Sequence, residues 1–247
     1  MAEDVAKGRI RLLDAVRGFS VISMVGFHLC YDLAFLAGVG LPLFEPPFRD
    51  VWRASISWTF LLVAGIMCTQ SRDNLRRAGR YLAVALAIYL VTSLAGVDDA
   101  ISFGIIFCMG GSTLVAWALL RAGLLRASWA GVALLVATFL LCLPVPQGSV
   151  GLPGHLAALP AALYATPWLS WLGFPGPHFV SGDYYPLLPF ALLYLAGAVL
   201  GLCVERGGGW PSWAYRHGCR PLEFVGRHAL WVYVLHQPVL LVLLGLV

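Results

Sequence analysis

Four ionisable residues interrupt the first long apolar stretch of the chain, LLDAVRGFSVISMVGFHLCYD. They are Asp14, Arg17, His28 and Asp32. At about 100° per residue on an α-helix, all four fall on one face. His28 and Asp32 are four residues apart, so the carboxylate can accept a hydrogen bond from the imidazole and fix its tautomer. This pattern indicates a general base or a nucleophile. A histidine that packs between helices is the structural alternative.

The last apolar stretch, GRHALWVYVLHQPVL, carries His236 and Gln237 just before Pro238. A proline inside a helix donates no backbone hydrogen bond, so the carbonyl of Val234 is left available as a polar group. We predict that Gln237 binds substrate; a kink satisfied by a neighbouring helix is the alternative. The predicted catalytic residues of the chain are His28, Asp32 and His236.

Two further polar groups lie next to apolar stretches. Asp183 and Tyr184, in SGDYYPLLP, are predicted to bind substrate, although Asp183 also fits the N-cap of the helix that follows. Arginine suits phosphate because its guanidinium offers paired donors. The predicted contacts to the phosphates of a nucleotide-like cofactor are Arg17, Arg72, Arg76, Arg77, Arg80 and Arg227. For the run from 72 to 80, a role in membrane topology alone is the alternative.

The composition predicts a membrane protein around these residues. Of the 247 residues, 60% are apolar and 11% charged, and the mean hydropathy is +0.83. A soluble domain carries about 25% charged residues, so this chain requires lipid as its solvent. We expect an all-α bundle of about seven transmembrane helices, forming one domain over residues 1–247. The predicted spans are 15–38, 54–71, 80–97, 101–120, 128–145, 186–204 and 224–247.

The distribution of basic residues predicts the orientation of the bundle. With the N-terminus in the cytoplasm, 14 of the 16 Lys and Arg residues face inward, and only Arg49 and Arg53 face outward. This bias places the C-terminus outside. It also explains the net charge of +4 without a nucleic-acid partner. Six scattered cysteines form no C-x-x-C pair, so we expect neither a disulfide framework nor a metal site.

Residues 146–185 form a long connection on the outer side. The connection is rich in proline, glycine and aromatic residues, too apolar for a solvated linker and too interrupted for a span. We predict a short interfacial or re-entrant helix around 154–172 that covers the outer face of the bundle. An ordered loop that rests on the bundle is the alternative.

Five motifs, in order, resemble a known family. RIRLLDAVRGFSVISMVGFHLCYDL is similar to the opening of the membrane acyltransferases related to heparan-α-glucosaminide N-acetyltransferase. WTFLLVAGI, ISFGIIFCMG, SGDYYPLLPF and VGRHALWVYVLHQP resemble later motifs of the same family. The resemblance extends from Arg9 to the end of the chain and is greatest to the bacterial branch. His28 matches the bacterial pattern. Phe107-Cys108 and Phe190 depart from the family's usual Leu-His and Trp.

The resemblance implies an integral, multi-pass membrane enzyme of a bacterial inner or plasma membrane. It implies transfer of an acetyl group from cytoplasmic acetyl-CoA, a co-substrate and not a permanently bound cofactor, to an amine or hydroxyl of an extracytoplasmic sugar or glycan. The expected partners are membrane lipid, acyl-CoA and the sugar-containing acceptor. In the predicted mechanism His28, oriented by Asp32, acts as the base, and a covalent acetyl-His28 intermediate is the other route.

Two other functional classes remain as alternatives. A transporter would also bury histidine and aspartate within its spans, but many transporters show internal repeats, and none is visible in this sequence. A noncatalytic membrane scaffold would use the buried polar residues for packing alone. A homo-oligomer is compatible with the sequence, which does not fix the acceptor, the acyl chain or the choice between N- and O-acylation.

Overall fold

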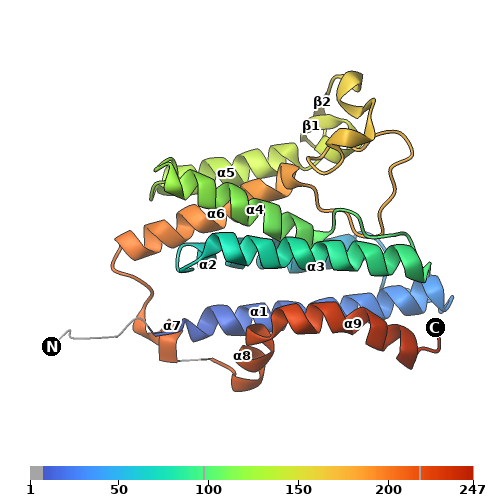
Figure 1. The fold of residues 1–247 in the computed structure, drawn as a ribbon, viewed down its shortest axis with the longest axis horizontal. Helices are drawn as coiled ribbons and strands as arrows, with labels where there is room; N and C mark the ends of the chain where they lie inside the picture. The colour runs from blue at the N-terminus through green and yellow to red at the C-terminus, as the bar shows by residue number, and fades with distance from the viewer. Residues whose placement is uncertain (1–7, 97, 217, 247) are drawn as a thin grey trace. The chain divides into compact units, whose positions relative to one another are not determined.

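The computed structural model describes residues 8–96, 98–216 and 218–246, most of them helical (Figure 1). A short π-helix, Asp32–Leu36, extends the first helix. A two-stranded antiparallel hairpin of β1 (Ser149–Leu152) and β2 (His155–Ala158) lies between the fifth and sixth helices. The helices are α1 (Arg11–Tyr31), α2 (Phe48–Cys68), α3 (Asn74–Ala95), α4 (Ile105–Arg121), α5 (Trp129–Cys142), α6 (Leu187–Arg206), α7 (Ser212–Arg216), α8 (Arg220–Arg227) and α9 (Ala229–Leu243).

The described residues include five helical segments long and apolar enough to cross a membrane. These segments are Arg11–Leu36, Phe48–Cys68, Asn74–Ala95, Trp129–Gln147 and Leu187–Arg206. The apolar helices α4 and α9 are shorter, with 17 and 15 residues. The prediction of a mainly helical membrane protein is therefore confirmed. The count of seven spans and the orientation of the termini stay predictions.

The chain forms two compact units, which are described separately. Unit 1 comprises the described residues up to Phe60 and from Gly208 onward, and unit 2 comprises Leu61–Gly207. The prediction of one domain over residues 1–247 stays a prediction. Unit 1 contains α1, the first part of α2, and α7 to α9. Unit 2 contains the end of α2, helices α3 to α6 and the hairpin.

Close approach of two glycines organises unit 1. A Cβ atom added to Gly18 of α1 would lie 1.9 Å from the carbonyl oxygen of Leu222, and one added to Gly226 of α8 would lie 1.9 Å from that of Asp14. Only glycine permits this close contact between the backbones of α1 and α8. The predicted span 224–247 is divided at His228, whose backbone (φ −105°, ψ +17°) is not helical. Its first residues belong to α8, which ends at Arg227, and α9 begins at Ala229.

Unit 2 is packed around α6. Gly197 of α6 lies against the backbone of Leu62, and Gly65 of α2 lies against the backbone of Tyr194, so these helices also meet through glycine. The hydroxyls of Thr113 on α4 and Tyr194 on α6 are 2.8 Å apart, and both side chains are fully buried. This polar pair is satisfied inside the unit, as a buried hydroxyl requires.

The segment between α5 and α6 corrects one prediction. The short helix expected around 154–172 was wrong, because the residues there form β2 and two 3-10 turns, 161–164 and 167–169. The hairpin turns at Pro153 and Gly154, and Gly154 has a φ of +88°, which an α-helix does not allow. Pro160 and Pro167 then interrupt the chain again. The all-α prediction missed this hairpin.

Candidate functional site

Two helices of unit 1 bring the predicted catalytic residues together. The rings of His28 on α1 and His236 on α9 have centroids 4.8 Å apart, at an angle of 60°. The amide Nε2 of Gln237 donates to both carboxylate oxygens of Asp32, at 2.9 and 3.1 Å. Four residues from the two ends of the sequence thus form one polar cluster within apolar helices. We call it the α1–α9 site.

Local backbone features place the four side chains. α1 changes to a π-helix at Asp32, where the backbone N–H of Ala37 donates to the carbonyl of Asp32 at 2.8 Å. Such π-turns are frequent at functional sites. Asp32 itself is fully buried. On α9, Pro238 follows Gln237 inside the helix. The proline was visible in the sequence, whereas the π-turn and the pairing of Gln237 with Asp32 were not predicted.

The hydrogen bond of His236 fixes its tautomer. Its Nδ1 lies 2.5 Å from the carbonyl oxygen of Tyr233. A carbonyl only accepts, so Nδ1 must carry the proton and donate. In the neutral ring, Nε2 then holds a free lone pair. Nε2 is buried and has no hydrogen-bond partner among the described residues, and the same is true of Oε1 of Gln237.

A buried nitrogen without a hydrogen-bond partner lowers the stability of the fold, so packing alone does not explain why it is there. A nitrogen lone pair held in this way can accept a proton from a substrate or attack a carbonyl carbon. The α1–α9 site therefore has the chemical means for acyl transfer. The predicted hydrogen bond between His28 and Asp32 stays a prediction, as do the catalytic roles of these residues.

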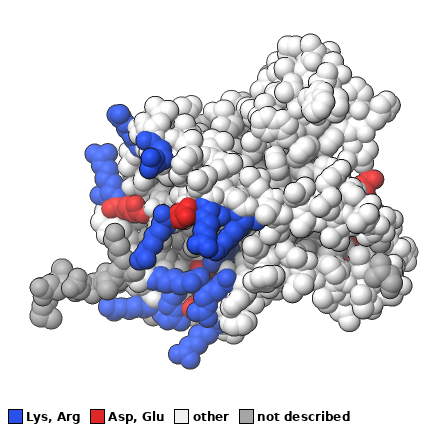
Figure 2. Space-filling model, in the orientation of Figure 1, with Lys and Arg blue, Asp and Glu red and all other residues white. Residues whose placement is uncertain are grey.

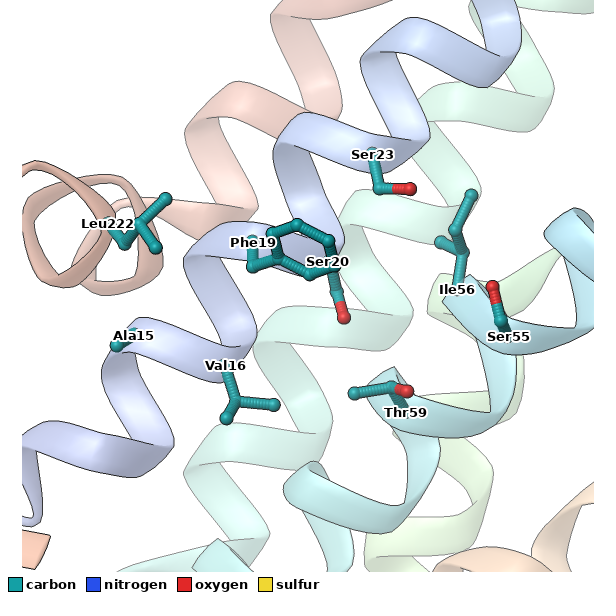
Figure 3. Close-up of a pocket in the computed structure, with 9 residues that line it drawn as sticks. All are labelled: Ala15, Val16, Phe19, Ser20, Ser23, Ser55, Ile56, Thr59 and Leu222. Carbon is teal, nitrogen blue, oxygen red and sulfur yellow. The ribbon is translucent and has the colours of Figure 1, made fainter. Parts of the chain in front are cut away.

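A cavity of about 350 Å³ lies along α1, on the N-terminal side of His28. Figure 3 shows Ser20 and Ser23 of α1 facing Ser55, Ile56 and Thr59 of α2 across it. The hydroxyl of Ser23 accepts a hydrogen bond of 2.8 Å from Nε1 of Trp52. The lining is therefore mainly apolar, with the hydroxyls of Ser20, Ser23, Ser55 and Thr59 placed among apolar side chains, which suits a flexible ligand with spaced amide groups.

The N-terminal end of unit 1 carries a second cavity, of about 640 Å³, lined by arginines and carboxylates. Arg17 Nη2 donates to Asp14 at 2.5 Å, and Arg9 also pairs with Asp14. Arg11 donates to both carboxylate oxygens of Glu223, at 3.1 and 3.0 Å, and this contact holds the pKa of Glu223 below its ordinary value. The residues lining the cavity include Arg9, Arg11, Arg220 and Arg227. Arginines outnumber carboxylates here, so an anion would be attracted.

Asp183 and Tyr184, the predicted substrate-binding residues of unit 2, form hydrogen bonds to backbone groups of the same unit. Asp183 Oδ2 accepts a 3.1 Å hydrogen bond from the backbone N–H of Ile105, the first residue of α4. Asp183 therefore caps α4, and not α6 as its position in the sequence suggested, because α6 begins after Pro186. The hydroxyl of Tyr184 donates to the carbonyl of Ser170 at 2.6 Å. A role for Asp183 and Tyr184 in binding substrate stays a prediction.

The four arginines of the run from 72 to 80 lie in unit 2 and differ among themselves. Arg72, Arg76 and Arg80 are exposed. Arg77 is half-buried, donates to the carbonyl of Ala64 at 3.3 Å and stacks on the ring of Tyr81. Phosphate binding by these arginines stays a prediction.

A scan against protein-family models matches residues 9–238 to the catalytic region of heparan-α-glucosaminide N-acetyltransferase. The chain belongs to this family. The match spans nearly the whole chain and includes all four residues of the α1–α9 site. Searches of curated proteins and of solved structures gave no match. The family resemblance deduced from the motifs is thus confirmed, and with the apolar helices it supports a transmembrane acetyltransferase. Membership of the bacterial branch stays a prediction.

Proposed function

We propose that this protein transfers an acetyl group from acetyl-CoA to an amine or hydroxyl of a sugar-containing acceptor, with the reaction taking place at the α1–α9 site. The observation that carries the proposal is the free, buried lone pair of His236 Nε2 beside the ring of His28. Family membership supports the reaction class. The donor and the acceptor are inferred from the chemistry of the cavities and from the acetyltransferase activity for which the family is named.

In the proposed reaction, His236 Nε2 takes the proton from the acceptor's N–H or O–H as the acceptor's nitrogen or oxygen attacks the thioester carbonyl carbon. The carbon–sulfur bond then breaks, and the thiolate of coenzyme A takes the proton from the imidazolium. The products are the acetylated acceptor and coenzyme A, and His236 returns to its neutral form. A base near neutrality contributes roughly 10²–10⁴ to the rate of such a step.

The proposal gives the role of base to His236, because its Nε2 is buried without a partner among the described residues, and not to His28 as the sequence predicted. His28 and the Asp32–Gln237 pair have other roles. His28 donates from its ring to the thioester oxygen, where negative charge develops during the attack. Asp32 and Gln237 act as positioning residues, because their two hydrogen bonds tie α1 to α9 next to the two histidines. The other route is attack by a histidine on the thioester to give an acetyl-imidazole, which the acceptor then opens. Acid quenching followed by mass spectrometry would detect this intermediate.

The donor would lie along α1. Its phosphates would contact the arginine-lined cavity that includes Arg227, and its pantetheine arm would follow the hydroxyl-lined cavity towards His28. Ser23 precedes His28 by five residues, or about 7.5 Å along a helix, so the cavity ends close to the reacting rings. The arginines of the run from 72 to 80 are the alternative phosphate contacts. Comparing acetyl-CoA affinity in Arg220→Ala/Arg227→Ala with Arg76→Ala/Arg77→Ala would identify which pair binds the donor.

We further propose that α4 and α9 also cross the membrane, giving seven spans with the N-terminus inside and the C-terminus outside. At 1.5 Å per residue they are about 25 and 22 Å long, which is short for a bilayer core of about 30 Å. The inward bias of Lys and Arg supports this orientation. A reporter fused to the C-terminus should be active only on the outer side, and a cytoplasmic signal would contradict an odd number of spans.

The direct test uses the purified protein in lipid nanodiscs, with acetyl-CoA as donor and glucosamine or glucose as probe acceptors. Acetyl-CoA should raise the melting temperature, because a ligand that binds only the folded state stabilises it. Acetylated sugar and free coenzyme A thiol should appear in equal amounts, and the acetylated atom would separate N- from O-transfer. Stabilisation by acetyl-CoA without transfer to any acceptor would favour a transporter. Neither stabilisation nor transfer would contradict the proposal.

A further inference from the structure

The segment between α5 and α6 exposes an unusual apolar surface within unit 2. No Asp, Glu, Lys or Arg occurs from residue 127 to residue 182. All four residues of β2, His155–Ala158, are exposed. Leu152 and Leu156, on either side of the hairpin turn, are 49% and 55% exposed, and Trp168 is 80% exposed. The lobe that carries β1 and β2 in Figure 1 shows neither blue nor red atoms in Figure 2.

The hairpin formed by β1 and β2 has little to stabilise it in water. A two-stranded hairpin is marginally stable by itself in water, and a strand exposed on both faces gains little from burial. The backbone pairs Ser149 with Ala158 and Leu152 with His155, so the polar groups that face the partner strand are satisfied within the hairpin. The groups on the two outer edges are left for water or lipid headgroups. The exposed side chains of the hairpin are mainly leucine, alanine and proline. Such a surface requires an apolar cover.

The chain connectivity places the hairpin at a membrane boundary. The candidate span that contains α5 ends at Gln147, and β1 begins at Ser149. The segment is followed by α6, a second candidate span, which packs against α5. The hairpin is therefore held where these two helices leave the hydrocarbon layer. Tryptophan is enriched at that depth, because its ring is amphipathic.

We propose that the hairpin and the turn at Pro167–Leu169 lie in the interfacial zone of the bilayer, with Leu152, Leu156 and Trp168 inserted between lipid headgroups. The partner is the neutral apolar–polar boundary of the lipid, since the segment offers no Lys or Arg for an anionic headgroup. The extra anchoring holds the connection between α5 and α6 flat against the membrane. This inference does not depend on the proposed acetyltransferase reaction.

Fluorescence quenching by brominated lipid tests this location. The full chain is placed in phosphatidylcholine nanodiscs, with or without lipid brominated close to the headgroup, and the spectrum of Trp168→Phe is subtracted from that of the wild type. The difference is the emission of Trp168, and shallow bromine should remove most of it. Trp129→Phe supplies a positive control, because Trp129 is 65% exposed on the candidate span of α5.

A second variant tests the leucines. Leu152→Ser/Leu156→Ser should reduce the quenching of Trp168 by shallow bromine, while the quenching of Trp129 stays unchanged. If Trp168 emission is insensitive to bromine and quenched by aqueous acrylamide, the segment is solvated and the proposal is wrong. If neither quencher reaches Trp168, protein covers it, either another part of this chain or a second copy, and the proposal is also wrong.

Discussion

The polar residues of the α1–α9 site in unit 1 differ from three of the polar residues of unit 2 in how completely their hydrogen bonds are satisfied. In unit 2, Asp183 caps α4, Tyr184 bonds Ser170, and Thr113 bonds Tyr194. At the α1–α9 site of unit 1, Nε2 of His236 and Oε1 of Gln237 are buried without partners among the described residues. Structural polar groups find their partners within the protein. Asn74 Oδ1 and Trp210 Nε1 are also buried without a partner among the described residues, but only at the α1–α9 site do two such groups lie beside a second histidine. We infer that a substrate completes the contacts there.

The largest expected effect is the loss of activity in His236→Ala. Removing the base should lower turnover by roughly 10²–10⁴, with little change in folding, because a general base contributes about this much. Acetyl-CoA consumption by the purified variant measures the loss. His228→Ala is the matched control, an exposed histidine of the same unit, and it should keep its activity. Near-normal turnover in His236→Ala would show that the unpaired groups of the α1–α9 site have no catalytic role.

Asp183→Ala should affect stability and not chemistry. Losing the cap of α4 should cost about 0.5–2 kcal/mol of unfolding free energy, as for other N-cap residues. Asp183→Asn keeps an accepting oxygen and should recover most of this loss. Melting temperature and turnover per folded molecule are measured on both variants. A fall in turnover without a fall in melting temperature would place Asp183 at a substrate, and unit 2 would then share in the site.

A smaller effect is expected at the buried pair of unit 2. Thr113→Val keeps the shape of the side chain but removes two hydrogen bonds, one to the carbonyl of Met109 within α4 and one to Tyr194. The loss of the bond to Tyr194 should cost about 0.6 kcal/mol, the average for hydrogen bonds between membrane helices. Thermal unfolding of the variant measures this cost. Any change in acetyl-CoA consumption at unchanged stability would show that this pair has a function beyond packing.

The smallest expected effect is a pH dependence of stability that comes from the contact between Arg11 and Glu223 in unit 1. The hydrogen bond from Arg11 lowers the pKa of Glu223 below its ordinary 4.5. The carboxylate therefore stabilises the packing of α8 on α1 above that pKa, and the contribution disappears as the pH falls through the lowered value. The melting temperature of Glu223→Gln should lie below that of the wild type at pH 7, and the gap should close in acid. A gap independent of pH would show that the charge of Glu223 contributes nothing.

The sequence predicted those parts of the molecule that depend on composition and short spacing. The apolar stretches form helices, and the sequence alone identifies the polar positions of α1 and the His236-Gln237 pair. Contacts between residues far apart in the sequence could not be predicted. The bond from Gln237 to Asp32 joins positions 205 residues apart (237 − 32), and no local pattern encodes it. Asp183 was expected to cap the helix that follows it, but chain folding brings it to α4.

The segment between α5 and α6 shows another limit. Its proline and glycine content excluded a clean span, but the same content is compatible with a helix, a loop or a hairpin. The turn at Pro153-Gly154 and the pairing of β1 with β2 make this segment a hairpin. The sequence signal for both is weak, because the segment lacks alternating polar and apolar residues. At the α1–α9 site, similarly, the residue types were predicted, while the tautomer of His236 depends on its bond to Tyr233.

The central claim is that His28 and His236 form one reacting site, and a double-mutant cycle tests it most directly. Turnover of acetyl-CoA with glucosamine is measured for His28→Ala, His236→Ala and the double variant, each corrected for folded protein. Residues that act as a unit show non-additive losses, so the double variant should lose little more than the worse single variant. Losses that multiply would show that the two histidines act separately. Near-normal turnover in the double variant would place the chemistry elsewhere.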